Sequence, residues 1–203
     1  MGKIIGVINQ KGGVGKTTTA VNLAAFLAKA GRKVLLIDTD SHGNATSGLS
    51  MERHRFEVDI YDVMMGETDV TEAIYPTSSK QLFLLPASMN LAGAEIEMVA
   101  MEEREYILKN IFDKIQSDFD YLIIDCPPAL GLMTLNVLSA ADSIIIPIQA
   151  EFYALEGLSQ LVKTIRSVTK NLNPDLDILG ILLTMFDGRT NLSLQVQQEV
   201  KDY

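Results

Sequence analysis

The 203-residue sequence contains one cysteine, Cys126, and only two histidines, His42 and His54. A single thiol excludes an internal disulfide framework and a metal site built on paired cysteines. It also argues against an electron-transferring reductase, because a subunit-bridging iron–sulfur cluster needs two thiolates from each chain. Neither histidine has a partner at a metal-ligand spacing, so we expect both in surface loops. We expect Cys126 to be a small buried residue.

Long apolar runs are also absent. No run approaches the roughly 18 residues that a membrane span requires. Residues 1–5 lead directly into an apolar strand, which leaves no room for a signal peptide. We therefore expect a soluble, cytoplasmic protein with no membrane partner. The 26 acidic residues outnumber the 17 basic residues, and the net charge of −9 argues against a nucleic-acid partner unless a local basic patch exists.

Apolar segments typical of buried strands alternate with helical patterns along the chain. We predict strands at 4–8, 33–38, 82–86, 121–125, 143–147 and 178–186. Predicted helices cover 16–30, 91–116 with a break near 100–103, 132–141, 154–172 and 191–203. Residues 41–48 read as a loop, and 52–76 as a peripheral excursion with one or two short helices.

This alternation implies right-handed crossovers between parallel strands. The predicted fold class is therefore α/β and doubly wound, with a mostly parallel sheet and helices on both faces. We expect a single P-loop ATPase domain over 1–203. Its C-terminal segment is expected to be missing, because a helical pattern is interrupted at 202–203.

The first predicted strand leads into a glycine-rich loop and then into a helix. The loop residues are Lys11, Gly12, Gly13, Val14, Gly15, Lys16, Thr17 and Thr18. In this context backbone N–H groups and a helix N-terminus bind the phosphates of a nucleotide, Lys16 reaches the β- and γ-phosphates, and Thr17 binds Mg²⁺. The standard phosphate-loop pattern fails strictly, because Gln10 stands at its first glycine position. The alternative is a glycine-rich turn with two solvated lysines.

Aspartates stand at the ends of two other predicted strands. Asp125 follows four apolar residues, which is the arrangement of a Walker B aspartate that holds Mg²⁺ directly or through water. Asp38 and Asp40 stand where open α/β sheets bind their ligands. Near a triphosphate, one of this pair can orient the water shell of the metal and the other can orient the attacking water. The alternative for each aspartate is a cap of a turn or a helix.

Together these motifs resemble those of the Soj-like branch of the ParA/MinD class of P-loop ATPases. The matching segments are 11–19, 38–40, 43–49, 91–95, 125–131, 153–157 and 183–187, and the likeness runs over 2–203. The resemblance implies a deviant Walker A loop, in which Lys11 reaches the partner's phosphates across a nucleotide-sandwich homodimer. It also implies that Asp40 acts in ATP hydrolysis, that Asp38 supports the surroundings of Mg²⁺, and that Asp125 belongs to Walker B.

The same resemblance implies a function on DNA. Met185 would pack on the adenine of ATP, and Arg189 would contact non-specific double-stranded DNA from the ATP-bound dimer. A ParB-like centromere-binding protein would stimulate slow ATP hydrolysis, which drives chromosome or plasmid segregation. The expected location is the nucleoid within the cytoplasm.

The chain departs from the family pattern at two places. Ser41 and His42 follow Asp40 where the family usually has Pro-Gln. The family also continues past residue 203, with a segment that closes over the base and adds basic DNA contacts. Two other functions stay open: a MinD-like positioning ATPase, which would need a C-terminal amphipathic helix, and a metabolic P-loop ligase, which would need a substrate pocket.

Overall fold

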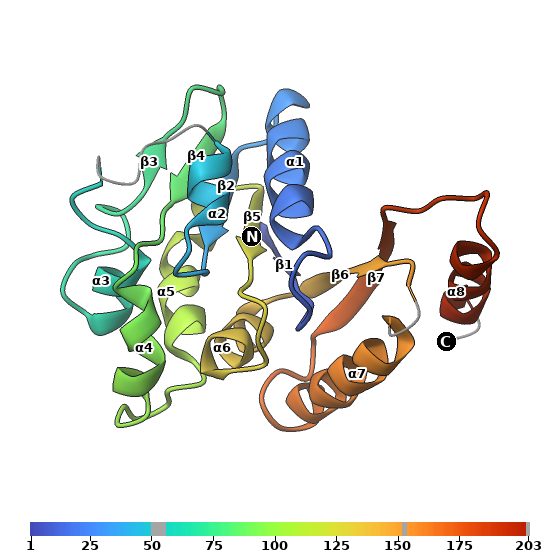
Figure 1. Ribbon diagram of the computed structural model, residues 1–203. Helices are drawn as coiled ribbons and strands as arrows, with labels where there is room; N and C mark the ends of the chain where they lie inside the picture. The colour runs from blue at the N-terminus through green and yellow to red at the C-terminus, as the bar shows by residue number, and fades with distance from the viewer. Residues whose placement is uncertain (50–55, 152–153, 202–203) are drawn as a thin grey trace.

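The computed structural model describes residues 1–49, 56–151 and 154–201, which form a central sheet with helices around it (Figure 1). His54 and Tyr153 lie outside these ranges. The strands are β1 (Lys3–Val7), β2 (Val34–Asp38), β3 (Tyr75–Pro76), β4 (Leu82–Leu85), β5 (Tyr121–Asp125), β6 (Ser143–Gln149) and β7 (Asp177–Thr184). Their order in the sheet is β3-β4-β2-β5-β1-β6-β7. Each neighbouring pair is parallel except β3 and β4, so the predicted doubly wound, mostly parallel sheet is confirmed.

The strand order reverses beside β1. From β1 the chain crosses to β2, on the far side of β5, and the later strands β6 and β7 extend the sheet in the other direction. In such sheets ligands bind at the carboxyl ends of the strands near the reversal. The Cα atom of Asp125 is in register with that of Val7 on one side and that of Asp38 on the other. The fold therefore brings the ends of β1, β2 and β5 together.

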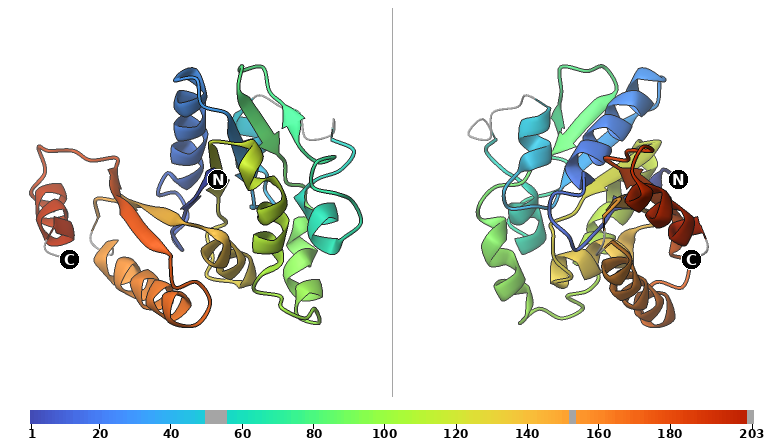
Figure 2. Two further views of the ribbon diagram at one scale, coloured as in Figure 1. Left: turned by 180° about the vertical axis from the view of Figure 1, so that it is seen from behind. Right: turned by 45° about the vertical axis from the view of Figure 1, so that its right-hand side comes forward.

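Helices cover both faces of the sheet. They are α1 (Lys16–Lys29), α2 (Asn44–Gly48), α3 (Ile60–Met65), α4 (Leu91–Met98), α5 (Ile107–Ile115), α6 (Leu132–Ala140), α7 (Ala154–Asn171) and α8 (Asn191–Lys201). The views in Figure 2 place α8 beyond β7, at the opposite end of the molecule from α3. In the described ranges, no helix is both long enough and apolar enough to cross a membrane.

Two separate clusters of side chains pack on the two faces. The period-two alternation of the strands sends Val34 and Leu36 to one face and Leu35 and Ile37 to the other. On the first face α1 buries small residues four apart, Ala20, Ala24 and Ala28. The opposite face packs against α3 to α7. A row of alanines lets α1 lie close to the sheet, which holds its N-terminus at the end of β1.

Most predicted elements are confirmed to within a few residues, including the break between α4 and α5. The predicted loop at 41–48 is wrong in part, because α2 begins at Asn44. Its residues are polar and show no apolar period, so nothing in the pattern indicated a helix. The two-residue strand β3 and its antiparallel pairing with β4 were not predicted.

The apolar pattern predicted across 91–116 does not form one buried stripe. Ile96 is 79% exposed and Val99 is 60% exposed, whereas α4 buries Leu91, Ala94 and Met98. The apolar spacing in the sequence had combined α4 and α5 into one continuous helical pattern. Because the chain turns between them, the register of α5 does not continue back into α4.

Strand β6 continues past its predicted end at Pro147. β1 pairs with β6 only as far as Ile145, so Pro147 lies beyond β1, where its missing N–H group costs no hydrogen bond on that side. The Pro147 carbonyl instead accepts a hydrogen bond of 2.7 Å from the Asn9 side chain. This contact ties the beginning of the glycine-rich loop to β6.

Candidate nucleotide and metal site

The glycine-rich loop joins β1 to α1 and turns through two left-handed residues, Gly13 (φ 76°) and Gly15 (φ 88°). A β-carbon is strained at such angles, so the loop requires glycine at both positions. The Thr184 hydroxyl, at the end of β7, donates a hydrogen bond of 2.8 Å to the Val14 carbonyl. α1 begins directly afterwards at Lys16, so the positive end of its dipole lies at this loop.

A cavity of about 320 Å³ lies at this helix N-terminus. It is lined by Gly12, Gly13, Gly15, Lys16, Thr17, Thr18, Asp40, Asn44, Pro128 and Met185. The loop, the end of β2 and the end of β7 therefore meet as the sequence predicted, and Met185 lies on the same cavity. Asn44 and Pro128 were not predicted as lining residues. A cavity at a helix N-terminus, lined by Lys16, Thr17 and Thr18, suits the phosphate chain of a nucleotide.

Two predicted nucleotide residues, Lys11 and Val14, do not line this cavity. They line a much smaller one, of about 20 Å³, together with Glu151. The Lys11 ammonium forms an ion pair with the Glu151 carboxylate, and Asn9 accepts a hydrogen bond of 3.0 Å from the Lys11 backbone N–H. The side chain of Lys11 is thus directed away from the phosphate cavity of its own chain.

Lys16 is nearly buried in the loop, at 7% exposure, and its ammonium donates a hydrogen bond of 2.9 Å to the Lys11 carbonyl. Burial lowers the pKa of Lys16, and the nearby acidic groups of Asp125 and Asp40 act against that shift. The two lysines of the loop therefore have different environments. One faces the phosphate cavity, and the other is paired near the surface.

Asp125 is fully buried at the end of β5, and its Oδ2 accepts a hydrogen bond of 2.6 Å from the Thr17 hydroxyl. Its Oδ1 is buried with no hydrogen-bond partner among the described residues. Burial raises the pKa of Asp125 to about 7; the Thr17 hydrogen bond and Lys16 oppose the rise, and the charges of Asp38 and Asp40 add to it.

An unpartnered, buried carboxylate oxygen beside a threonine hydroxyl fits a hard divalent cation. Mg²⁺ is commonly bound by one or two carboxylates together with phosphates and water. Among the described residues no group of three or more carboxylate, histidine or cysteine side chains could hold a metal alone. Thr17 and Asp125 therefore suit a Mg²⁺ that arrives with the phosphates of a nucleotide.

Asp38 has a different environment from Asp40. Its Oδ2 accepts hydrogen bonds of 2.8 Å from both the backbone N–H and the hydroxyl of Thr46, and its Oδ1 accepts one of 3.1 Å from the Asp40 backbone. Burial raises the pKa of Asp38, whereas the Thr46 hydrogen bonds oppose the rise. Asp38 anchors α2 behind the cavity, and Asp40 lines it. Asp38 does not line the cavity, and its support of the metal's surroundings stays a prediction.

Asp40 also contacts His42, which the sequence did not predict. Oδ1 of Asp40 accepts a hydrogen bond of 3.0 Å from the His42 backbone N–H and lies 2.8 Å from Nδ1 of its ring. The His42 side chain is 71% exposed, as expected for a surface loop, and the Asp40 side chain is 9% exposed. No pattern in the sequence indicated this pair, because the spacing of two residues fixes no side-chain contact in a turn.

The loop after β5 is held by a residue from α4. The Glu95 carboxylate accepts a hydrogen bond of 3.1 Å from the Met133 backbone in the first turn of α6. A β-carbon at Gly131 would overlap this carboxylate, so any larger residue there would displace the Glu95 side chain. Cys126 lies in the same segment at 1% exposure, as predicted, and burial strongly raises the pKa of its thiol.

Arg189 lies outside the nucleotide cavity, in the turn between β7 and α8. Its side chain is 89% exposed. Its Nε and Nη2 donate hydrogen bonds of 2.8 and 2.7 Å to the two carboxylate oxygens of Asp187. The sequence predicted a side chain held out in solvent, and the structure adds a local acidic partner that neutralises it.

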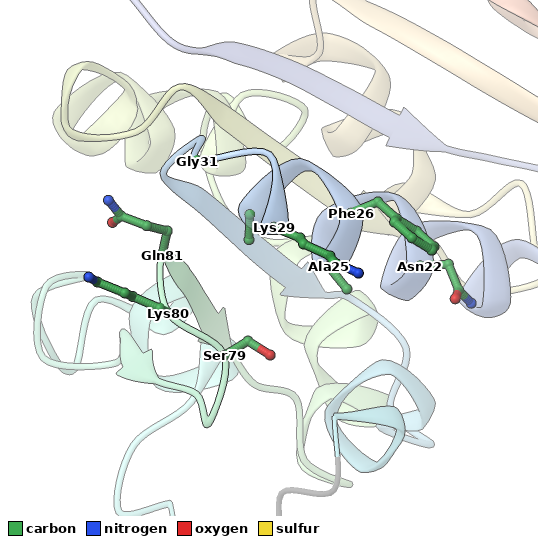
Figure 3. Close-up of a pocket in the computed structure, with 9 residues that line it drawn as sticks. Asn22, Ala25, Phe26, Lys29, Gly31, Ser79, Lys80 and Gln81 are labelled. Carbon is green, nitrogen blue, oxygen red and sulfur yellow. The ribbon is translucent and has the colours of Figure 1, made fainter.

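A cavity of about 740 Å³ lies at the other end of α1 (Figure 3). It lies between α1 and the turn at 79–81, and its lining includes Phe26 and Lys29. In Figure 3, Lys80 and Gln81 extend away from α1, so the polar groups do not converge. No predicted site residue lines this cavity.

Comparison with known proteins finds relatives along the whole chain. The family model described as an AAA domain matches residues 2–178. The chain is 56% identical over 203 residues to the sporulation initiation inhibitor protein Soj of Bacillus subtilis, covering 100% of this chain and 80% of that protein. It is 52% identical over 203 residues to the chromosome partitioning protein ParA of Myxococcus xanthus, covering 100% of this chain and 72% of that protein.

A solved structure has the same fold with a nucleotide bound. The crystal structure of cobyrinic acid a,c-diamide synthase from Mycobacterium smegmatis, with bound ATP analogue and magnesium, superposes with a TM-score of 0.94 at 42% identity. The match covers 100% of this chain and 82% of that chain.

Proposed function

This chain belongs to the Soj/ParA family of chromosome-partitioning ATPases, and we propose from that membership that it is an ATP-dependent switch in DNA segregation. It is an ATPase that uses ATP and Mg²⁺. The single observation that supports the site assignment best is the Thr17–Asp125 pair with its unpartnered Oδ1, beside the buried Lys16.

The residues of the cavity divide the work of phosphoryl transfer. Lys16 and the N–H groups of the glycine-rich loop bind the phosphates. Met185, which lines the same cavity, would pack on the adenine. Thr17 and Asp125 would hold Mg²⁺, which neutralises the charge that develops on the phosphates when it is bound. Asp40 orients the attacking water, and Asp38 holds the loop that carries Asp40.

The switch itself is a change of assembly. ATP-bound chains form a homodimer in which Lys11 leaves Glu151 and binds the phosphates of the partner. Arg189 and its symmetry copy then contribute to a basic surface that binds DNA without sequence preference. A ParB-like protein stimulates hydrolysis, which returns the protein to monomers and releases DNA in the nucleoid region of the cytoplasm. Such a switch needs slow ATP turnover, because its output is the balance between ATP-bound dimers and monomers.

This proposal is tested by measuring mass and DNA binding under the same conditions. We expect light scattering to show a dimer with ATP and Mg²⁺, and a monomer with ADP or with no nucleotide. Only the dimer should bind two unrelated DNA duplexes, and with similar affinity. Equal DNA binding without nucleotide would contradict the proposal. ATP-dependent binding to anionic lipid vesicles in place of DNA would favour a membrane-positioning ATPase instead.

Amide formation is a second candidate, because the Mycobacterium smegmatis protein with 42% identity is named an amide synthase. A synthase that takes nitrogen from glutamine needs a nucleophilic thiolate. The one cysteine of these 203 residues, Cys126, is buried, and its raised pKa disfavours the thiolate. The partitioning proteins are also closer in sequence, at 56% and 52% identity. ATP turnover that required ammonia or glutamine together with a carboxylic acid would reverse this preference.

A further inference from the structure

The two carboxylate oxygens of Asp40 have unequal surroundings. Oδ1 accepts the His42 backbone N–H at 3.0 Å and lies 2.8 Å from Nδ1 of the imidazole. No residue in the described ranges donates a hydrogen bond to Oδ2. Asp40 lines the nucleotide cavity, and Oδ2 is the oxygen that the contacts with His42 leave unused.

The contact fixes the proton on the imidazole ring. An ionised carboxylate only accepts hydrogen bonds, so Nδ1 of His42 must carry the hydrogen that lies between them. Nε2 has no part in this contact, and the ring is 71% exposed. The backbone bond from position 42 is an ordinary turn contact that any residue except proline can make. The ring bond is what histidine adds.

Several charges act on the Asp40 carboxylate, so a second hydrogen bond is needed to hold its orientation. Lys16 attracts Asp40, and the carboxylates of Asp38 and Asp125 repel it. With the backbone bond alone, the carboxylate can rotate about its last bond and exchange its two oxygens. With the ring bond as well, Oδ1 stays engaged, and Oδ2 is the oxygen left for a ligand of the cavity that Asp40 lines.

We propose that His42 is a positioning residue for ATP hydrolysis, acting through Nδ1–H on Oδ1 of Asp40. It keeps Oδ2 oriented to accept a hydrogen bond from the attacking water. The inference rests on the role of Asp40 in the proposed function. A loss of orientation lowers the rate of the chemical step while it leaves ATP binding intact.

Two substitutions separate the two ring nitrogens. The side-chain amide nitrogen of asparagine is bonded to Cγ, as Nδ1 is in histidine, so His42→Asn keeps a donor at that position. Glutamine carries its amide one atom further out, so His42→Gln supplies a group near Nε2 and removes the Nδ1 donor. Both variants, and His42→Ala, keep the backbone bond to Asp40. The three variants therefore separate the effect of the ring hydrogen bond from that of the backbone hydrogen bond.

The experiment measures kcat and KM for ATP hydrolysis, and ATP-dependent dimerisation, for the parental protein and these variants. We expect His42→Ala and His42→Gln to lower kcat by roughly tenfold with KM unchanged, as for the loss of one hydrogen bond in the transition state. His42→Asn should retain most of the parental kcat. Dimerisation should be unchanged in all three.

Three results would overturn the inference. Parental kcat in all three variants would leave His42 without a role in hydrolysis. Full activity in His42→Gln alone would assign the role to Nε2. Loss of ATP binding or dimerisation in every variant would mean that His42 only holds the loop. Asp40→Ala serves as the separating control: if it hydrolyses ATP at the parental rate, the assignment of Asp40 fails, whatever His42 does.

Discussion

The hydroxyl of Thr17 donates a hydrogen bond of 2.6 Å to Oδ2 of Asp125, and the two residues are 108 positions apart in the chain. They meet because β1 and β5 are neighbours whose carboxyl ends lie at the same edge of the sheet. The contact leaves the other carboxylate oxygen buried without a partner among the described residues. In the absence of metal and nucleotide, this part of the site is therefore costly to keep ionised.

The first prediction is a pH-dependent stability that comes from Asp125. Its pKa is raised from 3.8 to about 7, so between these values the folded protein holds a proton that the unfolded chain releases. Its stabilising contribution is present at low pH and is lost as the pH rises toward 7. Asp125→Asn should remove a decline of roughly 2 kcal/mol between about pH 5.5 and 7.5. Urea denaturation without metal or nucleotide measures this decline.

The control for that experiment is Asp113→Asn, which removes an exposed carboxylate in α5. This variant should keep the parental pH dependence. If Asp125→Asn and the parental protein declined in parallel, the decline would arise elsewhere and Asp125 would be ionised throughout.

The second prediction separates the two lysines of the loop. Lys16→Ala should lower ATP affinity at least tenfold, because a hydrogen bond to a charged group contributes about 1.5–3 kcal/mol. Lys11→Ala should keep ATP binding and lose the ATP dimer, because the Lys11 side chain is paired with Glu151 outside the phosphate cavity. Fluorescent-nucleotide titration and light scattering measure the two properties. Equal losses of affinity in both variants would exclude a role of Lys11 in trans.

The third prediction concerns Asp40→Ala. Removing one carboxylate beside the triphosphate lowers repulsion, so ATP binding and dimerisation should persist. Turnover should stop, because the attacking water loses the acceptor that orients it. A stalled, DNA-bound dimer in the presence of ATP is the expected state. Phosphate release at the parental rate would move this role to another residue.

The fourth prediction is about Arg189, whose guanidinium is paired with Asp187. Arg189→Ala should weaken ATP-dependent DNA binding equally for two unrelated duplexes. Each phosphate contact adds about 0.9 to the slope of log affinity against log salt, so loss of both copies in a dimer should lower the slope by up to about 1.8. Asp187→Asn should strengthen binding, because it releases the guanidinium from its local partner.

Arg32→Ala is the matched control for charge, since Arg32 is also exposed but lies between α1 and β2. It should change the slope little. An unchanged slope in Arg189→Ala, or an effect on one duplex only, would show that Arg189 makes no phosphate contact.

Local patterns in the sequence predicted the elements and the edge of the sheet where the site lies. Buried strands such as β5 and the alanine-rich helix α1 follow directly from apolar periodicity. The loop residues and Asp125 follow from their place at strand ends. The partners of these residues could not be predicted in this way. Glu151 opposite Lys11 and Glu95 at the N-terminus of α6 are brought there by packing between distant segments, and no local pattern encodes such contacts.

The burial of Cys126 makes the protein convenient for spectroscopic labelling. It is the one thiol in the sequence, it is 1% exposed, and its raised pKa leaves almost no reactive thiolate. A cysteine introduced on the surface would therefore react with a maleimide dye, whereas the native thiol of Cys126 would not. Conversely, slow modification of Cys126 by excess reagent reports how often the end of β5 opens. The modification rate of Cys126, measured with and without ATP, then shows whether the nucleotide changes local opening beside Asp125.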